Sequence, residues 1–228
     1  MSFRMPDHTH RVAINGRTGT GKTHFGAWLL SLAPFDKIPY VIVDYKRDEL
    51  LNGIERAKFI DDRKLPRIPG IYILHATPFD KTGIENWLRK VYDHGKIGLF
   101  LDEAYMLPNQ KRDDSSFVAI LTQGRSLHIP AIVLTQRPSH VTPYVFTEAD
   151  FYVLFPLNDQ KDIERVSDRA PVKDPEHPAW DMTRRLPRYH SRWYDQGEHF
   201  SAVMKPAPSK EVILETFDDR LKPKRKFY

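Results

Sequence analysis

The sequence predicts an α/β fold with a central, mostly parallel sheet flanked by helices. Short apolar runs typical of buried strands alternate with helical segments between residues 11 and 155. A glycine-bearing loop, Gly16–Gly21, stands between the first apolar run and a segment with helical periodicity. The chain has 228 residues, of which 40% are hydrophobic, so one sizeable core can form.

Six apolar runs predict the strands of this sheet. They cover residues 11–15, 40–44, 71–74, 97–101, 131–134 and 151–155. The fourth run is apolar on both faces apart from Gly98, as expected of a central parallel strand. Apolar residues at helical spacing place helices at residues 23–32, 82–92 and about 115–127. Pro34 stops the first helix and Gly95 closes the second.

The pattern changes after residue 156. We expect residues 1–156 to form the core and residues 157–228 to form a C-terminal appendage packed on the same domain. Prolines punctuate the start of this appendage, which predicts loops and short helices. Further on, residues 189–194 and 199–204 flank a turn-like Asp-Gln-Gly-Glu, which predicts an antiparallel β-hairpin.

Composition excludes several classes of site. The absence of cysteine excludes disulfides, thiolate zinc sites, iron–sulfur clusters and cysteine nucleophiles. No apolar run approaches the roughly 20 residues that span a bilayer, and the N-terminus carries no apolar signal-peptide core. The net charge of +5 permits a polyanionic partner without demonstrating one.

The loop after the first strand has the pattern of a phosphate-binding loop: Gly, four residues, Gly, Lys, Ser/Thr. Such a loop turns backbone N–H groups around phosphate oxygens, in conformations that side chains would obstruct. The following helix adds its positive N-terminal end. Nucleotide contacts are therefore expected from Gly16, Arg17, Thr18, Gly19, Thr20, Gly21, Lys22 and Thr23. Lys22 would reach the β- and γ-phosphates, and the Thr23 hydroxyl would coordinate Mg²⁺.

Polar side chains follow two other buried strands. Asp102 is expected to hold the Mg²⁺ and Glu103 to orient and deprotonate the attacking water. The alternative is a solvated pair, as fits the other Asp-Asp pairs of the chain, which lack a buried strand before them. Gln136 ends the strand at 131–134, and strand carboxyl ends line the ligand crevice of a parallel sheet. Gln136 would sense the γ-phosphate or position water, or is simply a strand-end amide.

The stretch from Gln123 to Ser139, Gln-Gly-Arg-Ser-Leu-His-Ile-Pro-Ala-Ile-Val-Leu-Thr-Gln-Arg-Pro-Ser, resembles the FtsK/HerA superfamily of DNA-translocating P-loop ATPases. In that superfamily an Arg-containing helix end leads into a strand that finishes in Thr/Ser-Gln-Arg-Pro-Ser. Together with the phosphate loop and the acidic pair, the resemblance covers about residues 11 to 156. The small size, without a membrane segment or an evident winged-helix domain, is most similar to the genome-packaging ATPases of tailless, membrane-containing viruses.

The resemblance implies a RecA-like fold in a homo-oligomeric ring, a hexamer, around double-stranded DNA. It further implies ATP as nucleotide, packaging of a viral genome into a preformed capsid, contact with capsid or portal-vertex proteins, and a place in the host cytoplasm or the virion. Arg125 matches the arginine that such enzymes present to the neighbouring subunit's nucleotide. Arg137 is the alternative for that role, and Arg125 could also be an ordinary helix-end arginine. Family members often carry the Asp-x-Lys seen at residues 44–46. Its place at the carboxyl end of a strand puts it near the active crevice, but no definite role is assigned to it.

Three basic segments are candidate DNA contacts. Lys111 and Arg112 lie in the loop at 106–116, where similar ATPases place a channel-facing loop; a solvated charged loop is the alternative. A second cluster interleaves Arg184, Arg185, Arg188 and Arg192 with Tyr189 and Trp193. For this cluster we favour aromatics that pack against the sheet over bases stacked on them. The tail at 222–226, with four Lys or Arg, would tether DNA or capsid or is simply a soluble end.

Other functions remain as alternatives. Within the superfamily these are ATPases of filamentous phage assembly, conjugation or DNA repair. A nucleotide-switched binding module is a second possibility, but a switch does not need a strong base such as Glu103. A small-molecule kinase would need an acceptor site, and the Gln136-Arg137-Pro138 strand end does not suit it.

Overall fold

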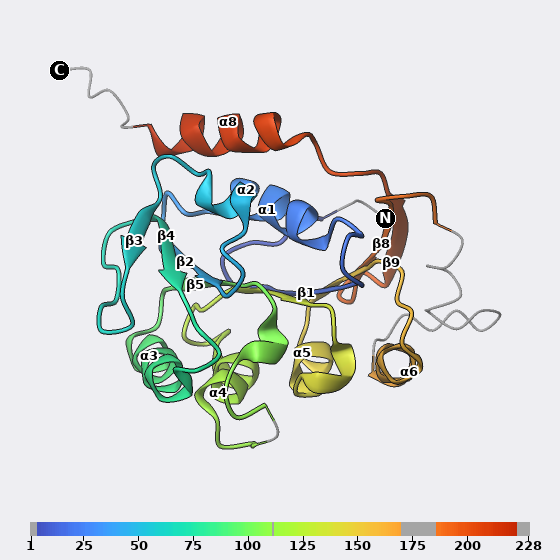
Figure 1. The fold of residues 1–228 in the computed structure, drawn as a ribbon, viewed down its shortest axis with the longest axis horizontal. Coiled ribbons are helices and arrows are strands. Elements are labelled where there is room, and N and C mark those ends of the chain that lie inside the picture. Colours follow the sequence, from blue (N-terminus) through green and yellow to red (C-terminus); the bar gives the residue numbers. More distant parts are fainter. Residues whose placement is uncertain (1–3, 111, 170–185, 223–228) are drawn as a thin grey trace.

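A nine-stranded sheet forms the centre of the computed structural model, which describes residues 4–110, 112–169 and 186–222 (Figure 1). The strand order is β3-β4-β2-β5-β6-β1-β7-β8-β9. The strands are β1 (Arg11–Asn15), β2 (Pro39–Asp44), β3 (Lys58–Ile60), β4 (Gly70–His75), β5 (Gly98–Leu101), β6 (Ala131–Thr135), β7 (Phe151–Leu154), β8 (Ser191–Asp195) and β9 (Phe200–Met204). The β7–β8 and β8–β9 pairs are antiparallel and the other pairs are parallel. The predicted α/β fold is confirmed.

Helices cover both faces of the sheet (Figure 1). One face carries α1 (Lys22–Leu32), α2 (Glu49–Asn52) and α8 (Lys210–Leu221), and the other carries α3 (Lys81–His94), α4 (Ser116–Gln123), α5 (Tyr144–Thr147) and α6 (Gln160–Arg169). Strand β2 illustrates the two cores. Val41 and Val43 join the cluster around Trp87 of α3, whereas Tyr40 and Ile42 join the cluster with α1 and α8. Successive side chains point to opposite faces, so a central strand is apolar throughout.

The six predicted strands and the first two predicted helices form within two residues of their expected bounds. The third helix is wrong at its end, because α4 stops at Gln123 rather than near residue 127. The Gly124 N–H donates the last hydrogen bond of the helix to the Ile120 carbonyl, at 2.9 Å. The Gly124 carbonyl then accepts hydrogen bonds from the N–H groups of Leu127 and Ile129. These bonds fold residues 124–129 into a tight turn that leads into β6.

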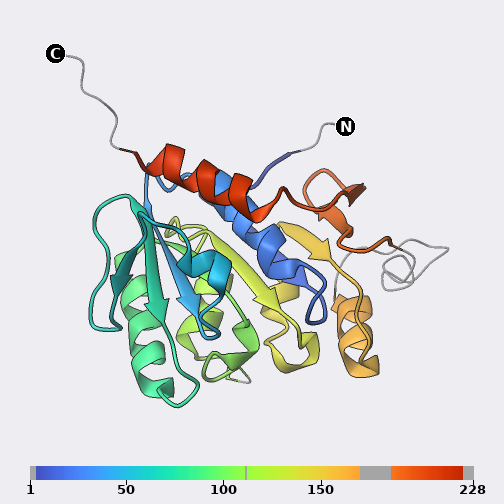
Figure 2. The ribbon, with the colours of Figure 1, turned by 45° about the horizontal axis from the view of Figure 1, so that its top comes forward.

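The sequence reading missed α8, the longest helix of the C-terminal part that the structure describes. Ser209 caps its N-terminus, and Ile213 and Phe217, four residues apart, are buried. The helix lies across α1, as the turned view shows (Figure 2). Phe217 stacks on Phe35 with ring centroids 5.9 Å apart, which anchors α8 to the core. The sequence signal for this helix was a serine followed by apolar residues four positions apart. The short elements β3, α2 and α5 were also missed.

The predicted C-terminal hairpin is confirmed as β8 and β9, and it extends the central sheet because β8 pairs with β7. Trp193 is fully buried and its ring lies 5.1 Å from that of Phe151, so this aromatic packs on the sheet as expected. Arg4 pairs with Asp195 at 2.8 Å and ties the N-terminal segment to the hairpin. Arg184 and Arg185 lie outside the described residues. No described helix is long and apolar enough to cross a membrane.

Candidate active site

The phosphate loop runs from the end of β1 to the start of α1. Gly19 and Gly21 have φ angles of 80° and 93°, a left-handed conformation that side chains disfavour. A Cβ on Gly16 would lie 2.5 Å from the Phe155 Cβ, so the first glycine is fixed by close packing on the segment after β7. All three glycines of the predicted loop therefore have a steric reason in the structure.

Neighbouring strands hold the loop in place. The Gly16 N–H donates to the Thr135 carbonyl at the end of β6, at 3.3 Å, and the Arg17 N–H donates to the Pro156 carbonyl after β7, at 3.1 Å. Since β1 lies between β6 and β7, the loop emerges in the middle of the carboxyl edge of the sheet. Helix α1 begins at Lys22 with no side-chain cap, which leaves its first N–H groups available to an anion.

The acidic pair directly follows β5 and lies beside the loop. The Thr23 hydroxyl donates to Asp102 Oδ1 at 3.3 Å. Burial, and secondarily the nearby Glu103 carboxylate, raise the pKa of Asp102 to about 6. Glu103 is fully buried and has φ 55° and ψ 54°, a strained backbone conformation for a residue other than glycine. Asp102 and Glu103 are thus held next to Lys22 and Thr23, as the sequence predicted for a shared site.

Two lysines contact the same oxygen of Glu103. Lys22 Nζ lies 3.0 Å from Glu103 Oε1, and Lys46 Nζ is paired with that oxygen as well. Lys46 comes from the turn after β2, the strand next to β5. The sequence placed Lys46 near the active crevice without a definite role, and the order of the strands brings it to the acidic pair.

Gln136 bridges the loop and the segment after the acidic pair. It accepts a hydrogen bond from the Thr18 hydroxyl and donates through Nε2 to the Tyr105 hydroxyl at 3.1 Å. The amide therefore lies at the carboxyl edge of β6, against the phosphate loop. Tyr105 was missed by the sequence analysis, because nothing in its position along the chain indicates this contact.

The chemistry of these residues fits a magnesium ion. Thr23 and Asp102 supply the hydroxyl and carboxylate oxygens that Mg²⁺ prefers. Within the described residues, Asp102 Oδ2 and Glu103 Oε2 are buried without a hydrogen bond, so acceptor capacity remains at the site. No group of three or more described His or acidic side chains could hold a metal by itself. This fits an ion that shares its remaining ligands with water and substrate phosphates.

A cleft of about 810 Å³ opens beside the loop, lined among others by Arg17, Thr20 and Tyr189. Tyr189 is 42% exposed and packs over Gly21, where an added Cβ would lie 3.3 Å from its ring. Arg188 lies over the same ring at 4.6 Å. Tyr189 therefore faces the loop rather than packing in the hairpin with Trp193, which differs from the expectation for this aromatic.

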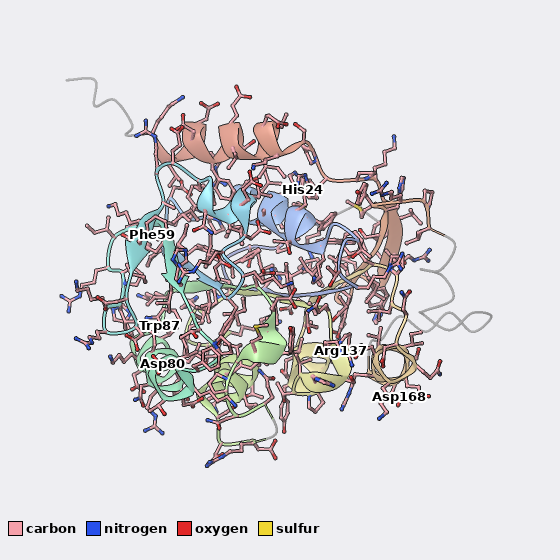
Figure 3. All side chains as sticks on the ribbon, viewed as in Figure 1. His24, Phe59, Asp80, Trp87, Arg137 and Asp168 are labelled. Atoms are coloured by element: carbon pink, nitrogen blue, oxygen red, sulfur yellow. The ribbon has the colours of Figure 1, made fainter. Side chains whose placement is uncertain are left out.

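The two candidate arginines lie near opposite ends of strand β6, Arg125 before its amino end and Arg137 after its carboxyl end. Arg125 precedes β6 and pairs with Asp150, just before β7, at the amino edge away from the phosphate loop. Its side chain is 56% exposed. Arg137 follows β6 at the carboxyl edge, on the α5 and α6 side of the sheet, where it pairs with Asp162 at 3.5 Å (Figure 3).

Of the candidate DNA contacts, Arg112 is exposed and pairs with Asp114 at 2.6 Å. Lys111 lies outside the described residues. The tail is described only at Lys222, which pairs with Asp218 and Asp219 at the end of α8.

No family model matches the sequence. The chain is 38% identical over 222 residues to the DNA packaging ATPase P9 of Enterobacteria phage PRD1, and the match covers 96% of each chain. The chain belongs to the family of this viral packaging ATPase. Membership confirms the resemblance that the stretch at 123–139 indicated.

Solved structures support the fold. The genome packaging NTPase B204 from Sulfolobus turreted icosahedral virus 2, in complex with AMPPCP, matches with a TM-score of 0.65 at 18% identity, over 89% of this chain and all of that one. VirB4 of Thermoanaerobacter pseudethanolicus matches with a TM-score of 0.63 at 10% identity, over 91% of this chain and 92% of that one. At these identities the comparison shows a shared P-loop ATPase fold.

Proposed function

We propose that the chain is a Mg²⁺-dependent ATPase motor that moves double-stranded DNA into a preformed viral capsid. Kinship with the packaging ATPase of phage PRD1 supports the task. The observation that carries the chemistry is the buried Glu103 carboxylate beside Lys22, one residue from the Asp102 that contacts Thr23. A base next to a metal-binding Asp suits hydrolysis, whereas a kinase must keep water from the γ-phosphate.

The proposed step is the attack of water on the γ-phosphate. Lys22 binds the β- and γ-phosphates, and the N–H groups of the loop hold the phosphate oxygens. Thr23 and Asp102 would hold Mg²⁺, which when bound offsets phosphate charge. Glu103 accepts a proton from the water as its oxygen bonds to phosphorus, and the bond to the β-phosphate oxygen breaks to release ADP. Gln136, bonded to Thr18 and Tyr105, positions the water or senses the phosphate.

Assembly into a ring would complete the site. Arg125 lies at the edge of the sheet away from its own phosphate loop, so it would act only on a neighbouring subunit's nucleotide. A guanidinium there would stabilise charge on the transferring phosphoryl group and couple hydrolysis to assembly. A homo-oligomeric ring, a hexamer, would place duplex DNA in its channel, where Arg112 and Lys111 would contact phosphates. Capsid or portal-vertex proteins would be its further partners, in the host cytoplasm or the virion.

The test is steady-state phosphate release with and without long duplex DNA across a salt series. We expect strong stimulation by DNA that falls as salt rises, because contacts between basic side chains and phosphates release counterions. Omission of Mg²⁺ should abolish turnover. Phosphate release that is indifferent to DNA at every salt concentration would contradict DNA as the substrate of the motor and leave only the ATPase.

A further inference from the structure

The turn after β2 is folded by a buried carboxylate. Asp44, the last residue of β2, is fully buried. Its Oδ1 accepts the backbone N–H groups of Lys46 at 3.0 Å and Arg47 at 2.8 Å, and its Oδ2 accepts Asn52 Nδ2 at 2.8 Å. A carboxylate that accepts several N–H groups fixes the backbone that surrounds it. The Asp-x-Lys motif is thus a device that sets the direction of Lys46.

The Lys46 side chain extends from this turn to Glu103, the proposed catalytic base. Lys46 Nζ pairs with Glu103 Oε1, the oxygen that Lys22 Nζ also contacts at 3.0 Å. The Glu103 and Lys22 side chains are 0% and 5% exposed, whereas that of Lys46 is 35% exposed. One buried carboxylate is therefore shared between two ammonium groups.

Nucleotide binding would change this balance. In the proposed function Lys22 turns to the β- and γ-phosphates, which takes one of the two cations away from Glu103. A buried carboxylate left without a partner is strongly unfavourable. Lys46 comes from another strand and needs no rearrangement to stay on Glu103.

We infer that Lys46 is a positioning residue that holds the Glu103 carboxylate when Lys22 moves to the nucleotide. The inference rests on the proposed function, because it assigns Lys22 to the phosphates. It predicts that Lys46 assists nucleotide binding without touching the nucleotide, and that it does so only while residue 103 carries a negative charge.

Arg47 offers a matched control on the same turn. Its side chain pairs with the His75 ring at the end of β4, away from Glu103. Replacing Lys46 or Arg47 by Met removes one positive charge from adjacent positions and leaves the backbone bonds to Asp44 in place. A general effect of charge or of turn stability would appear in both variants.

The experiment is a double-mutant cycle read by the affinity for the non-hydrolysable analogue AMPPCP with Mg²⁺. We expect Lys46→Met to weaken binding by about 10-fold or more when residue 103 is Glu, because the buried carboxylate loses the cation that remains beside it. In a Glu103→Gln background the same change should alter affinity by less than about 2-fold, because a neutral amide needs no cation. Lys46→Arg should retain most of the affinity, and Arg47→Met should have no effect in either background. Lys46→Gln serves as a second variant should Lys46→Met fold poorly.

Equal weakening by Lys46→Met in both backgrounds would assign Lys46 a merely structural role and overturn the inference. No weakening in the Glu103 background would also overturn it. Lys22→Ala in the same titration separates this failure from that of the proposed function. Binding that does not depend on Lys22 would refute the phosphate-loop assignment, and the inference would fall with it. Binding that depends on Lys22 but not on Lys46 would overturn the inference alone.

Discussion

Replacement of Glu103 by Gln tests whether the Glu103 carboxylate is the base that accepts a proton from the attacking water. Glu103 Oε1 is occupied by Lys22 and Lys46, and among the described residues Oε2 is buried without a hydrogen bond. Oε2 is therefore the oxygen available to accept a proton. Glutamine keeps the shape and an acceptor for the lysines, so the fold and nucleotide binding should persist while the base is lost.

The expected loss follows from the burial of this group. A general base contributes about 10²- to 10⁴-fold in rate. Glu103 is fully buried, so bulk water does not replace it, and Asp102 already accepts the Thr23 hydroxyl. We therefore expect the upper part of that range, a loss of about 10³- to 10⁴-fold in kcat, or roughly 4 to 5 kcal/mol in activation free energy.

The assay is steady-state phosphate release at saturating Mg²⁺ and ATP, with ATP affinity measured separately. Glu85→Gln is a suitable control, because the Glu85 carboxylate accepts the Ser116 N–H at 2.8 Å at the start of α4 and lies in no part of the proposed site. The control should hydrolyse ATP at the wild-type rate. A Glu103→Gln rate within about 3-fold of wild type would refute Glu103 as the base.

Three further predictions concern the loop, the ring and the fold. Lys22→Ala should abolish detectable ATP binding by equilibrium titration, and wild-type affinity would remove the phosphate-loop assignment. Arg125→Ala subunits should bind ATP but not hydrolyse it in rings, and mixing them with wild-type subunits should lower phosphate release more than in proportion to their share. A proportional loss would indicate that Arg125 acts in cis. The same mixing experiment with Arg137→Ala tests the other candidate arginine. Burial would raise the pKa of Asp195, but the hydrogen bond from Arg4 and the backbone N–H groups of the turn outweigh it, so the pKa is lowered. A lowered folded-state pKa stabilises the fold above the usual Asp value of about 4, and this contribution is lost as the pH falls below it. Thermal melting of Asp195→Asn should therefore depend less on pH below about 4 than wild type, and an unchanged dependence would contradict this account.

Local patterns were enough to predict most of the core. The run from Val12 to Ile14 and that from Ala131 to Leu134 are apolar because both faces of a parallel sheet are covered by helices. The glycine spacing of the phosphate loop likewise follows from local backbone requirements at Gly19 and Gly21. Such features depend on neighbours in the chain, which the sequence displays directly.

Several other contacts between distant segments could not be predicted in this way. Lys46 reaches Glu103 only because β2 lies beside β5, and Tyr105 reaches Gln136 because β5 lies beside β6. The order of strands in a parallel sheet is set by crossovers that leave no mark in residue spacing. Helix α8 is a different case, because the sequence does contain its N-cap, Ser209. The helix was missed because the segment before it has no regular pattern.

The most direct test of the central claim is ATP-driven movement along duplex DNA. A linear duplex carrying a triplex-forming oligonucleotide reports movement, because a motor that tracks the duplex displaces the third strand. We expect the wild-type protein with Mg²⁺ and ATP to displace the oligonucleotide, and AMPPCP or the Glu103→Gln variant to leave it bound. Protein that binds the duplex and hydrolyses ATP but never displaces the third strand would contradict a DNA-translocating motor.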